Sequence, residues 1–166
     1  ALEALQQALE ADSTFDILQI HDTRGYTLLH VALLNTLNEI AKVVVDTLDT
    51  RRPSEKIDYI CSKTDEGFTA LHFAAFRGNL KFCRMLTERN ADILAKNNQG
   101  LNVIHIAAQG DQPVSIAYFI EKGVPLSEID TKGSTALHWA AFLGCENSTN
   151  FLTSWGADPN QRDLEG

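Results

Sequence analysis

Apolar residues along this chain come in short blocks that alternate with tight turns. In one block Phe73, Ala74 and Ala75 follow each other directly, and Gly78 ends the block. A second block follows at 80–87. Short apolar blocks of this kind, separated by glycine, predict two short helices joined by a turn. The alanines in the first block would let neighbouring helices approach closely.

This two-helix unit recurs along the chain. Glycines at 25, 67, 100, 133 and 166 are separated by 42, 33, 33 and 33 residues. Each glycine is predicted to occupy a turn in which a positive φ is cheap for glycine alone. A residue that can cap a helix follows two positions later in each unit: Thr27, Thr69, Asn102 and Thr135. The pattern predicts an all-α solenoid of stacked helix-turn-helix units with β-turn fingers.

The period of 33 and a core of the form T-x-L-H-x-A resemble the ankyrin-repeat family. The second unit shows that core as Gly67-Phe-Thr-Ala-Leu-His72. The resemblance implies a structural role for one glycine and one histidine in each unit, namely Gly25, His30, Gly67, His72, Gly100, His105, Gly133 and His138. Each histidine would tie its repeat to the neighbouring turn rather than bind a metal. The third unit departs from the pattern, because its second turn glycine is displaced by one residue and Asp111 stands at the usual position.

The repeats divide the chain into consecutive segments. We expect an N-terminal helix and cap at 1–21, followed by repeats at 22–63, 64–96, 97–129 and 130–162, and the start of a fifth repeat at 163–166. The first repeat carries nine extra residues, since its spacing is 42 rather than 33. These residues fall near 49–63, where the run 51–54 (Arg-Arg-Pro-Ser) is typical of a polar loop. We expect the array to continue beyond Gly166, because a repeat cannot bury its apolar face alone.

Composition narrows the classes of function. The formal net charge is −8, which argues against a nucleic-acid partner. Basic residues do cluster at 77–96, and a solvated helix face is the favoured interpretation of that cluster. The three cysteines, Cys61, Cys83 and Cys145, lack the spacing of a zinc site or a disulfide framework. Cys145 begins a predicted helix, so the helix dipole could lower its pKa, although an ordinary turn cysteine is the favoured interpretation.

The sequence contains none of the common catalytic motifs, so we expect no catalytic residues, no metal and no cofactor in this chain. Reduced cysteines and the lack of any apolar run of membrane-spanning length predict a cytoplasmic location without direct membrane contact. A protein or peptide is then the expected partner. From Asn97 onward there are three basic and eight acidic residues, a local net charge of −5, which favours a basic ligand.

In ankyrin proteins the turn tips and the ends of the inner helices line a concave groove. By that resemblance, we expect the partner-binding positions of this chain to be Tyr26, Leu34, Phe68, Phe76, Arg77, Leu101, Gln109, Trp139, Phe142 and Leu143. Many are large and apolar, and an exposed apolar patch usually marks a binding site. The alternative is that some of these side chains pack on one another along the stack.

A narrower resemblance is to the ankyrin domains that precede Asp-His-His-Cys protein S-acyltransferases (palmitoyltransferases). The segment Leu137-His-Trp-Ala-Ala141 carries it most clearly. The resemblance implies that Trp139 and Gln109, the latter in place of an asparagine, grip a short proline-containing peptide. Trp139 would stack on the proline and donate its indole N–H to a peptide carbonyl, or it would mainly pack between helices. Under this interpretation the chain recruits substrates at the cytosolic face of a membrane, for a parent enzyme whose catalytic domain lies outside it. A pure recognition module is the other interpretation.

Overall fold

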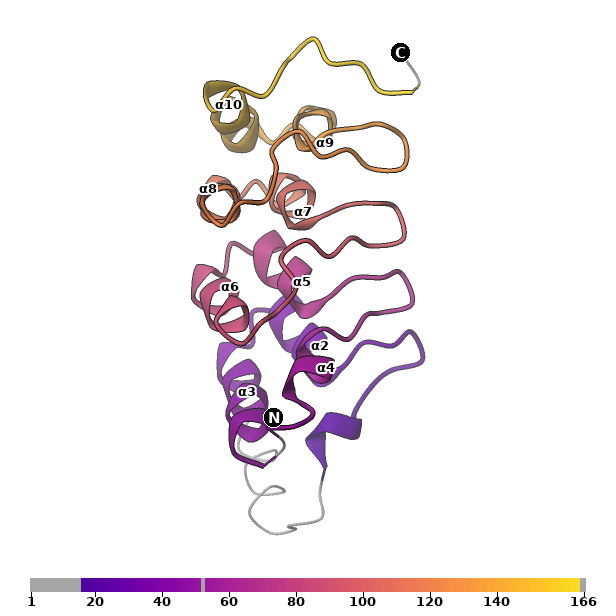
Figure 1. The fold of residues 1–166 in the computed structure, drawn as a ribbon, viewed down its shortest axis with the longest axis vertical. Helices are drawn as coiled ribbons and strands as arrows, with labels where there is room; N and C mark the ends of the chain where they lie inside the picture. Colours follow the sequence, from indigo (N-terminus) through magenta and orange to yellow (C-terminus); the bar gives the residue numbers. More distant parts are fainter. Residues whose placement is uncertain (1–15, 52, 165–166) are drawn as a thin grey trace.

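The computed structural model describes residues 16–51 and 53–164, which form a stack of helix pairs with loops projecting from one side (Figure 1). The all-helical array predicted from the repeat spacing is confirmed. The only β-type pairing in the described ranges consists of two isolated bridges, His21 with Thr27 and Ile129 with Thr135. Of the segment 1–21, predicted as an N-terminal helix and cap, residues 1–15 lie outside the described residues.

Each repeat contributes one inner and one outer helix, and the fingers project beyond the inner helices (Figure 1). The inner helices are α2 (Leu28–Leu34), α5 (Ala70–Phe76), α7 (Val103–Gln109) and α9 (Ala136–Leu143). The outer helices are α3 (Asn38–Arg51), α6 (Leu80–Thr87), α8 (Pro113–Glu121) and α10 (Glu146–Ser154). A short 3-10 helix, η1 (Ile17–Gln19), precedes the first repeat, and a short helix α4 (Lys56–Ile60) follows α3.

The inner helices begin where the sequence places a capping residue. The Thr135 hydroxyl accepts a hydrogen bond from the backbone N–H of His138 at 3.4 Å, and Thr27 accepts one from His30 in the same way. In return, Nδ1 of His138 accepts the backbone N–H of Thr135 at 3.1 Å. This reciprocal pair satisfies donors that every helix N-terminus leaves open. The Thr-x-x-His spacing therefore fixes both the start of the helix and the ring of the histidine.

The turn between inner and outer helix requires a residue with positive φ in each repeat. Gly78 and Gly144 adopt φ of 64° and 70°, whereas Thr36 and Asp111 stand at the same place with φ of 57° and 53°. Asp111 uses its side chain there, since its carboxylate accepts the backbone N–H of Ser148 at 2.7 Å in the next repeat. The carboxylate thereby caps the first turn of α10, which explains an aspartate where glycine is usual.

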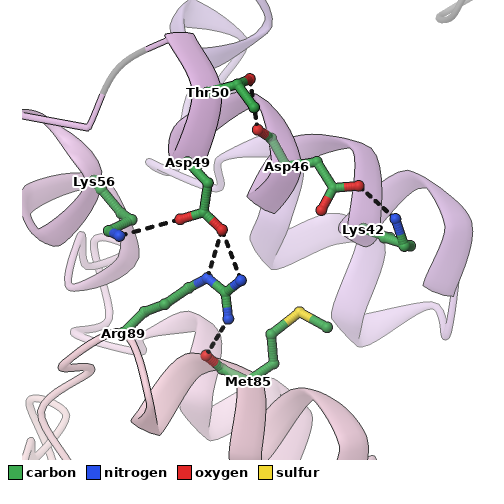
Figure 2. A network of polar contacts seen from close by, with 7 residues as sticks. All are labelled: Lys42, Asp46, Asp49, Thr50, Lys56, Met85 and Arg89. Carbon is green, nitrogen blue, oxygen red and sulfur yellow. Dashed lines mark hydrogen bonds and ion pairs between the residues drawn. The ribbon is translucent and has the colours of Figure 1, made fainter.

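The nine extra residues of the first repeat form more helix than the sequence indicated. The predicted polar loop at 51–54 is wrong at its start, because α3 continues through Arg51, and α4 begins shortly afterwards at Lys56. The Asp49 side chain explains how this insertion is held (Figure 2): it pairs with Lys56 Nζ at 3.1 Å and with Arg89 Nη2 at 2.6 Å. The Arg89 guanidinium also donates to the carbonyl of Met85 at 3.0 Å. Asp49 therefore joins α3, α4 and the turn after α6 across the first two repeats.

The core lies between the two layers of helices. Alanines on the inner helices, Ala74 and Ala107 among them, are fully buried and let adjacent inner helices pack closely. The outer helices contribute the largest buried side chains, Phe82 and Phe119. The alanines of the inner helices, together with large buried side chains from both layers such as Leu71 and Phe82, thus fill the stack.

Candidate partner-binding groove

The expected groove positions differ widely in exposure. Phe142 is 81% exposed and Leu143 is 49% exposed. Arg77 is also exposed, whereas Tyr26, Leu34, Phe68, Phe76, Gln109 and Trp139 are partly buried. Leu101 is only 2% exposed, so the structure corrects its assignment to the groove surface. Burial of a leucine side chain in the stack is more favourable than its exposure to water.

In the first two repeats the aromatic groove side chains pack on one another. The ring of Phe73 lies 5.5 Å from that of Tyr26 and 5.6 Å from that of Phe68, measured between centroids. The guanidinium of Arg24 covers the Tyr26 ring at 4.9 Å. These contacts correspond to the alternative in which groove residues pack along the stack, and they leave little aromatic surface for a partner.

Arg77 has a local role at the end of α5. Its Nε donates to the backbone carbonyl of Leu34 at 2.6 Å, and its guanidinium lies 5.7 Å from the centre of the Phe76 ring. Because the Leu34 carbonyl lies at the end of α2, where helical partners run out, this bond satisfies an open acceptor. Arg77 therefore connects the first two inner helices while remaining at the surface.

The fourth repeat presents an open hollow. A pocket of about 310 Å³ is lined by side chains of the fourth finger, α9 and the segment after α10: Lys132, Ser134, His138, Trp139, Phe142 and Asp163. The rings of Trp139 and Phe142 lie 6.3 Å apart at 87° and form two nearly perpendicular walls. Gln109 is not among the lining residues. The pair expected to share one stretch of groove is therefore not brought together in this pocket.

The Trp139 indole makes a hydrogen bond within the chain. Its Nε1–H donates to Asp130 Oδ2 at 2.9 Å, while Asp130 Oδ1 accepts the backbone N–H groups of Lys132 and Ser134 at 2.8 and 2.9 Å. Burial raises the pKa of Asp130, but the hydrogen bonds from Ser134 and Trp139 outweigh it and leave that pKa below its usual value. The carboxylate is thus ionised and fully engaged. The expectation that the indole N–H is available to a partner carbonyl is corrected by this bond.

Cys145 lies against the preceding repeat. Its Sγ lies 3.6 Å from the carbonyl oxygen of Gln109, and its side chain is partly buried. Burial raises the pKa of the thiol, and the charge of Asp111 raises it further. The helix dipole considered from the sequence does not prevail, because desolvation and a neighbouring carboxylate both disfavour the thiolate.

Three of the four repeat histidines are buried. His30 and His72 are fully covered and His105 is 1% exposed. Nε2 of His105 contacts the carbonyl of Ser134 in the next finger at 3.2 Å, as a histidine that ties adjacent repeats would. Burial lowers the pKa of His30 and of His72 to about 4, and lowers that of His105 as well. Across 16–51 and 53–164 no group of three or more His, Cys, Asp or Glu side chains is arranged to hold a metal ion.

The basic cluster at 77–96 is only partly a solvated face. Arg89 is engaged with Asp49, as described above, and Lys96 Nζ pairs with Glu128 at 2.6 Å. These two basic side chains therefore link neighbouring repeats and are not free to bind an anionic ligand. Among the helices that the structure describes, none has the length and apolar character needed to cross a membrane.

Comparison with known proteins agrees with this architecture. The family described as "Ankyrin repeats (3 copies)" matches residues 1–97 and 91–163. Inversin of Canis lupus familiaris is 30% identical over 128 residues, which cover 75% of this chain and 12% of inversin. Palmitoyltransferase akr1 of Schizosaccharomyces pombe is 32% identical over 137 residues, covering 61% of this chain and 21% of akr1. The putative palmitoyltransferase ZDHHC13 of Danio rerio is 31% identical over 90 residues, covering 54% and 14%. The chain thus spans between 12% and 21% of the length of these relatives, and it belongs to the ankyrin-repeat family.

Proposed function

We propose that this chain binds a partner protein by holding an extended peptide segment in the groove of its fourth repeat. The observation that carries the proposal is the 81% exposure of Phe142 beside the pocket walled by Trp139. A phenylalanine left in water forgoes about 1.5–3 kcal/mol of burial free energy, which an apolar ligand group would recover. Aromatic side chains in a concave site are also the residues that most often dominate binding energies.

The charge of the site favours a ligand that is not acidic. The formal net charge of the chain is −8, and residues from Asn97 onward account for −5 of it. A segment with apolar or proline side chains flanked by basic residues would complement both the aromatic walls and this charge. Proline suits the pocket because its ring can stack on the face of an indole.

Recruitment for a palmitoyltransferase is a second candidate function. Palmitoyltransferases recur among the similar proteins, and the segment Leu137–Ala141 carries the resemblance noted in the sequence. In that case this chain would supply substrate recognition at the cytosolic face of a membrane, and the acyl transfer would occur on another part of the parent protein. We propose no catalytic role for the residues of this chain.

A random-peptide display library panned against the purified chain tests the binding proposal. Selected peptides should bind the wild type, and Trp139→Ala should cost about 2 kcal/mol of affinity or more. Phe142→Ser should weaken binding as well, with little loss of stability, because the Phe142 side chain is already exposed.

Two variants outside the groove serve as matched controls. Trp155→Ala removes a half-exposed tryptophan next to α10, and Val114→Ser changes an exposed apolar residue on α8. Neither should alter the affinity of the selected peptides. If Trp139→Ala lowered thermal stability while affinity stayed unchanged, the groove of repeat four would not be the binding site.

A further inference from the structure

We infer that Asp130 is a positioning residue of this groove: its carboxylate holds the Trp139 indole by the N–H edge, so that a partner meets the ring face and not a hydrogen-bond donor. The inference rests on the proposed function, since it concerns how the same pocket recognises its ligand. It also names the class of ligand group, which is a flat or apolar side chain that needs no carbonyl facing the indole nitrogen.

The finger turns of repeats two and three show which part of the Asp130 side chain the turn itself requires. In repeat three, Asn97 stands at the same place, and its Oδ1 accepts the backbone N–H groups of Gln99 and Leu101 at 3.0 and 2.9 Å. In repeat two, the Thr64 hydroxyl accepts from the backbone of Phe68 at 3.2 Å. The turn therefore needs one side-chain acceptor, and an amide or a hydroxyl is sufficient.

The second oxygen of Asp130 is what distinguishes it from Asn97. Asn97 Nδ2 is buried without a hydrogen-bond partner, whereas Asp130 Oδ2 accepts the indole N–H of Trp139 at 2.9 Å. At the repeat position of Trp139, repeat three has Ile106, which carries no donor. In repeat one, Asp22 stands at the same place with Val31 at the position of Trp139, and Asp22 Oδ1 accepts the backbone N–H groups of Arg24 and Tyr26 at 2.8 and 2.9 Å. A carboxylate therefore shapes the turn in both fingers, and in the fourth finger its second oxygen also accepts the indole N–H. The bond is charge-assisted and lies at a side chain that is only 7% exposed, which strengthens it relative to a surface contact.

The hydrogen bond determines which part of the indole the pocket offers. Both the Trp139 ring and the Phe142 ring line the pocket, and their planes lie at 87°. A tryptophan side chain rotates about two bonds, so an indole without the Asp130 contact could populate other rotamers. With its N–H engaged, the indole gives the pocket a fixed apolar wall, which reduces the entropy lost when a ligand binds.

The first test uses the free chain and needs no ligand. In a Trp155→Phe background, Trp139 is the only tryptophan, so its indole N–H and its fluorescence can be followed alone. Asp130→Asn should preserve the turn, as Asn97 does in repeat three, but should speed exchange of the indole proton by about ten-fold or more, since a charge-assisted hydrogen bond is lost. It should also change quenching of Trp139 by acrylamide. Unchanged exchange and quenching would overturn the inference.

The second test measures affinity for a peptide selected by display on the wild-type chain. Asp130→Asn should weaken binding by about three- to ten-fold, because the indole is no longer fixed. Trp139→Phe removes the N–H, so adding Asp130→Asn to it should cause no further loss, and the two substitutions should be strongly non-additive. Asn97→Asp, which places a carboxylate where no indole can use it, should leave affinity unchanged.

The outcomes separate the inference from the proposed function. If Trp139→Ala abolishes binding while Asp130→Asn leaves affinity intact, the groove binds peptide but Asp130 does not position its wall. If no peptide is selected, or if Trp139→Ala has no effect, the proposed function fails and the role of Asp130 in binding fails with it. The exchange measurement would still decide whether Asp130 fixes the indole.

Discussion

Mild acid should destabilise this protein, because its buried histidines are held neutral. His30 and His72 are fully buried, and burial lowers the pKa of each to about 4, from an ordinary value of 6.5. The unfolded chain therefore takes up protons at these sites below pH 6.5, while the folded chain takes them up only near pH 4. The free energy of unfolding is therefore undiminished by these histidines above pH 6.5, and it decreases as the pH falls towards 4.

The size of the effect follows from the two pKa values. At pH 5 each histidine lowers the free energy of unfolding by about 2 kcal/mol, so the pair removes about 4 kcal/mol. That is a large part of the roughly 5–15 kcal/mol by which domains are stable. Near pH 5 the slope should approach about 2.7 kcal/mol per pH unit, which corresponds to two protons taken up on unfolding. His105, whose pKa is also lowered by burial, acts in the same direction.

Carboxylates do not mask this window. The pKa values of Asp49, Asp111 and Asp130 are lowered from 3.8, so the stability that these groups contribute is lost only as the pH falls to about 4 and below. Losses between pH 6.5 and 5 therefore belong to the histidines.

Urea denaturation followed by circular dichroism at pH 5.0–7.5 measures the slope directly. His72→Gln should lower the free energy of unfolding at neutral pH. It should also reduce the slope of that free energy against pH by the contribution of one proton. Val114→Ser, which changes an exposed side chain without a titratable group, should leave the slope unchanged. A free energy of unfolding that changes by less than about 1 kcal/mol between pH 7 and pH 5 would refute the reasoning.

Three further predictions follow from single contacts. Arg89→Ala should lower the free energy of unfolding by about 1–3 kcal/mol, because Asp49 loses a partly buried ion-pair partner. The control Lys42→Ala breaks an exposed ion pair with Asp46 and should change the free energy of unfolding by less than about 1 kcal/mol. Equal losses for the two variants would contradict this prediction. Gly110→Ala should lower the free energy of unfolding by about 1–3 kcal/mol, because the added Cβ would lie 2.0 Å from the Phe76 carbonyl oxygen. The control Gly144→Ala has open space around the added Cβ but a φ of 70°, and it should lower the free energy of unfolding by about 1 kcal/mol. A larger loss for Gly144→Ala than for Gly110→Ala would be evidence against the close approach. Iodoacetamide at pH 8 should alkylate Cys145 more slowly than it alkylates glutathione, because the thiol pKa is raised; a faster reaction would show an activated cysteine.

The repeat itself could be predicted because its residues act locally. A glycine, a capping residue and a histidine at fixed spacing set the turn, the helix start and the ring contact within a few positions. The insertion in the first repeat could not be predicted in the same way. The segment from Arg51 to Lys56 is polar enough to predict a loop. The helices on either side of it are held by the ion pair between Asp49 and Arg89, two residues that lie 40 positions apart in the sequence. Contacts of that range leave no periodic signal.

The groove was predicted less well, because surface exposure depends on what lies across the stack. Arg89 illustrates this limit, since it belongs to the basic cluster at 77–96, for which a solvated helix face is the interpretation that the sequence favours. Its two bonds to Asp49 make it part of the scaffold instead, so Trp155 and Val114 are the better control positions. The bond from Trp139 to Asp130 joins residues nine positions apart, and their proximity follows from the fold of the finger rather than from a motif.

Equivalent positions of the repeats carry different chemistry, and this difference localises the proposed site. The position after the repeat histidine holds Phe73 in repeat two and Ile106 in repeat three, which are 7% and 4% exposed, and Val31 in repeat one, which is 37% exposed but has no aromatic ring. Phe73 is covered by the aromatic rings of two fingers, so its groove surface is already occupied by the chain itself. Trp139 at the same position remains partly exposed beside Phe142, and its polar edge is satisfied by Asp130. A site with an open apolar face and no unsatisfied donor is stable without a ligand and can still bind one, which is why we place recognition in repeat four.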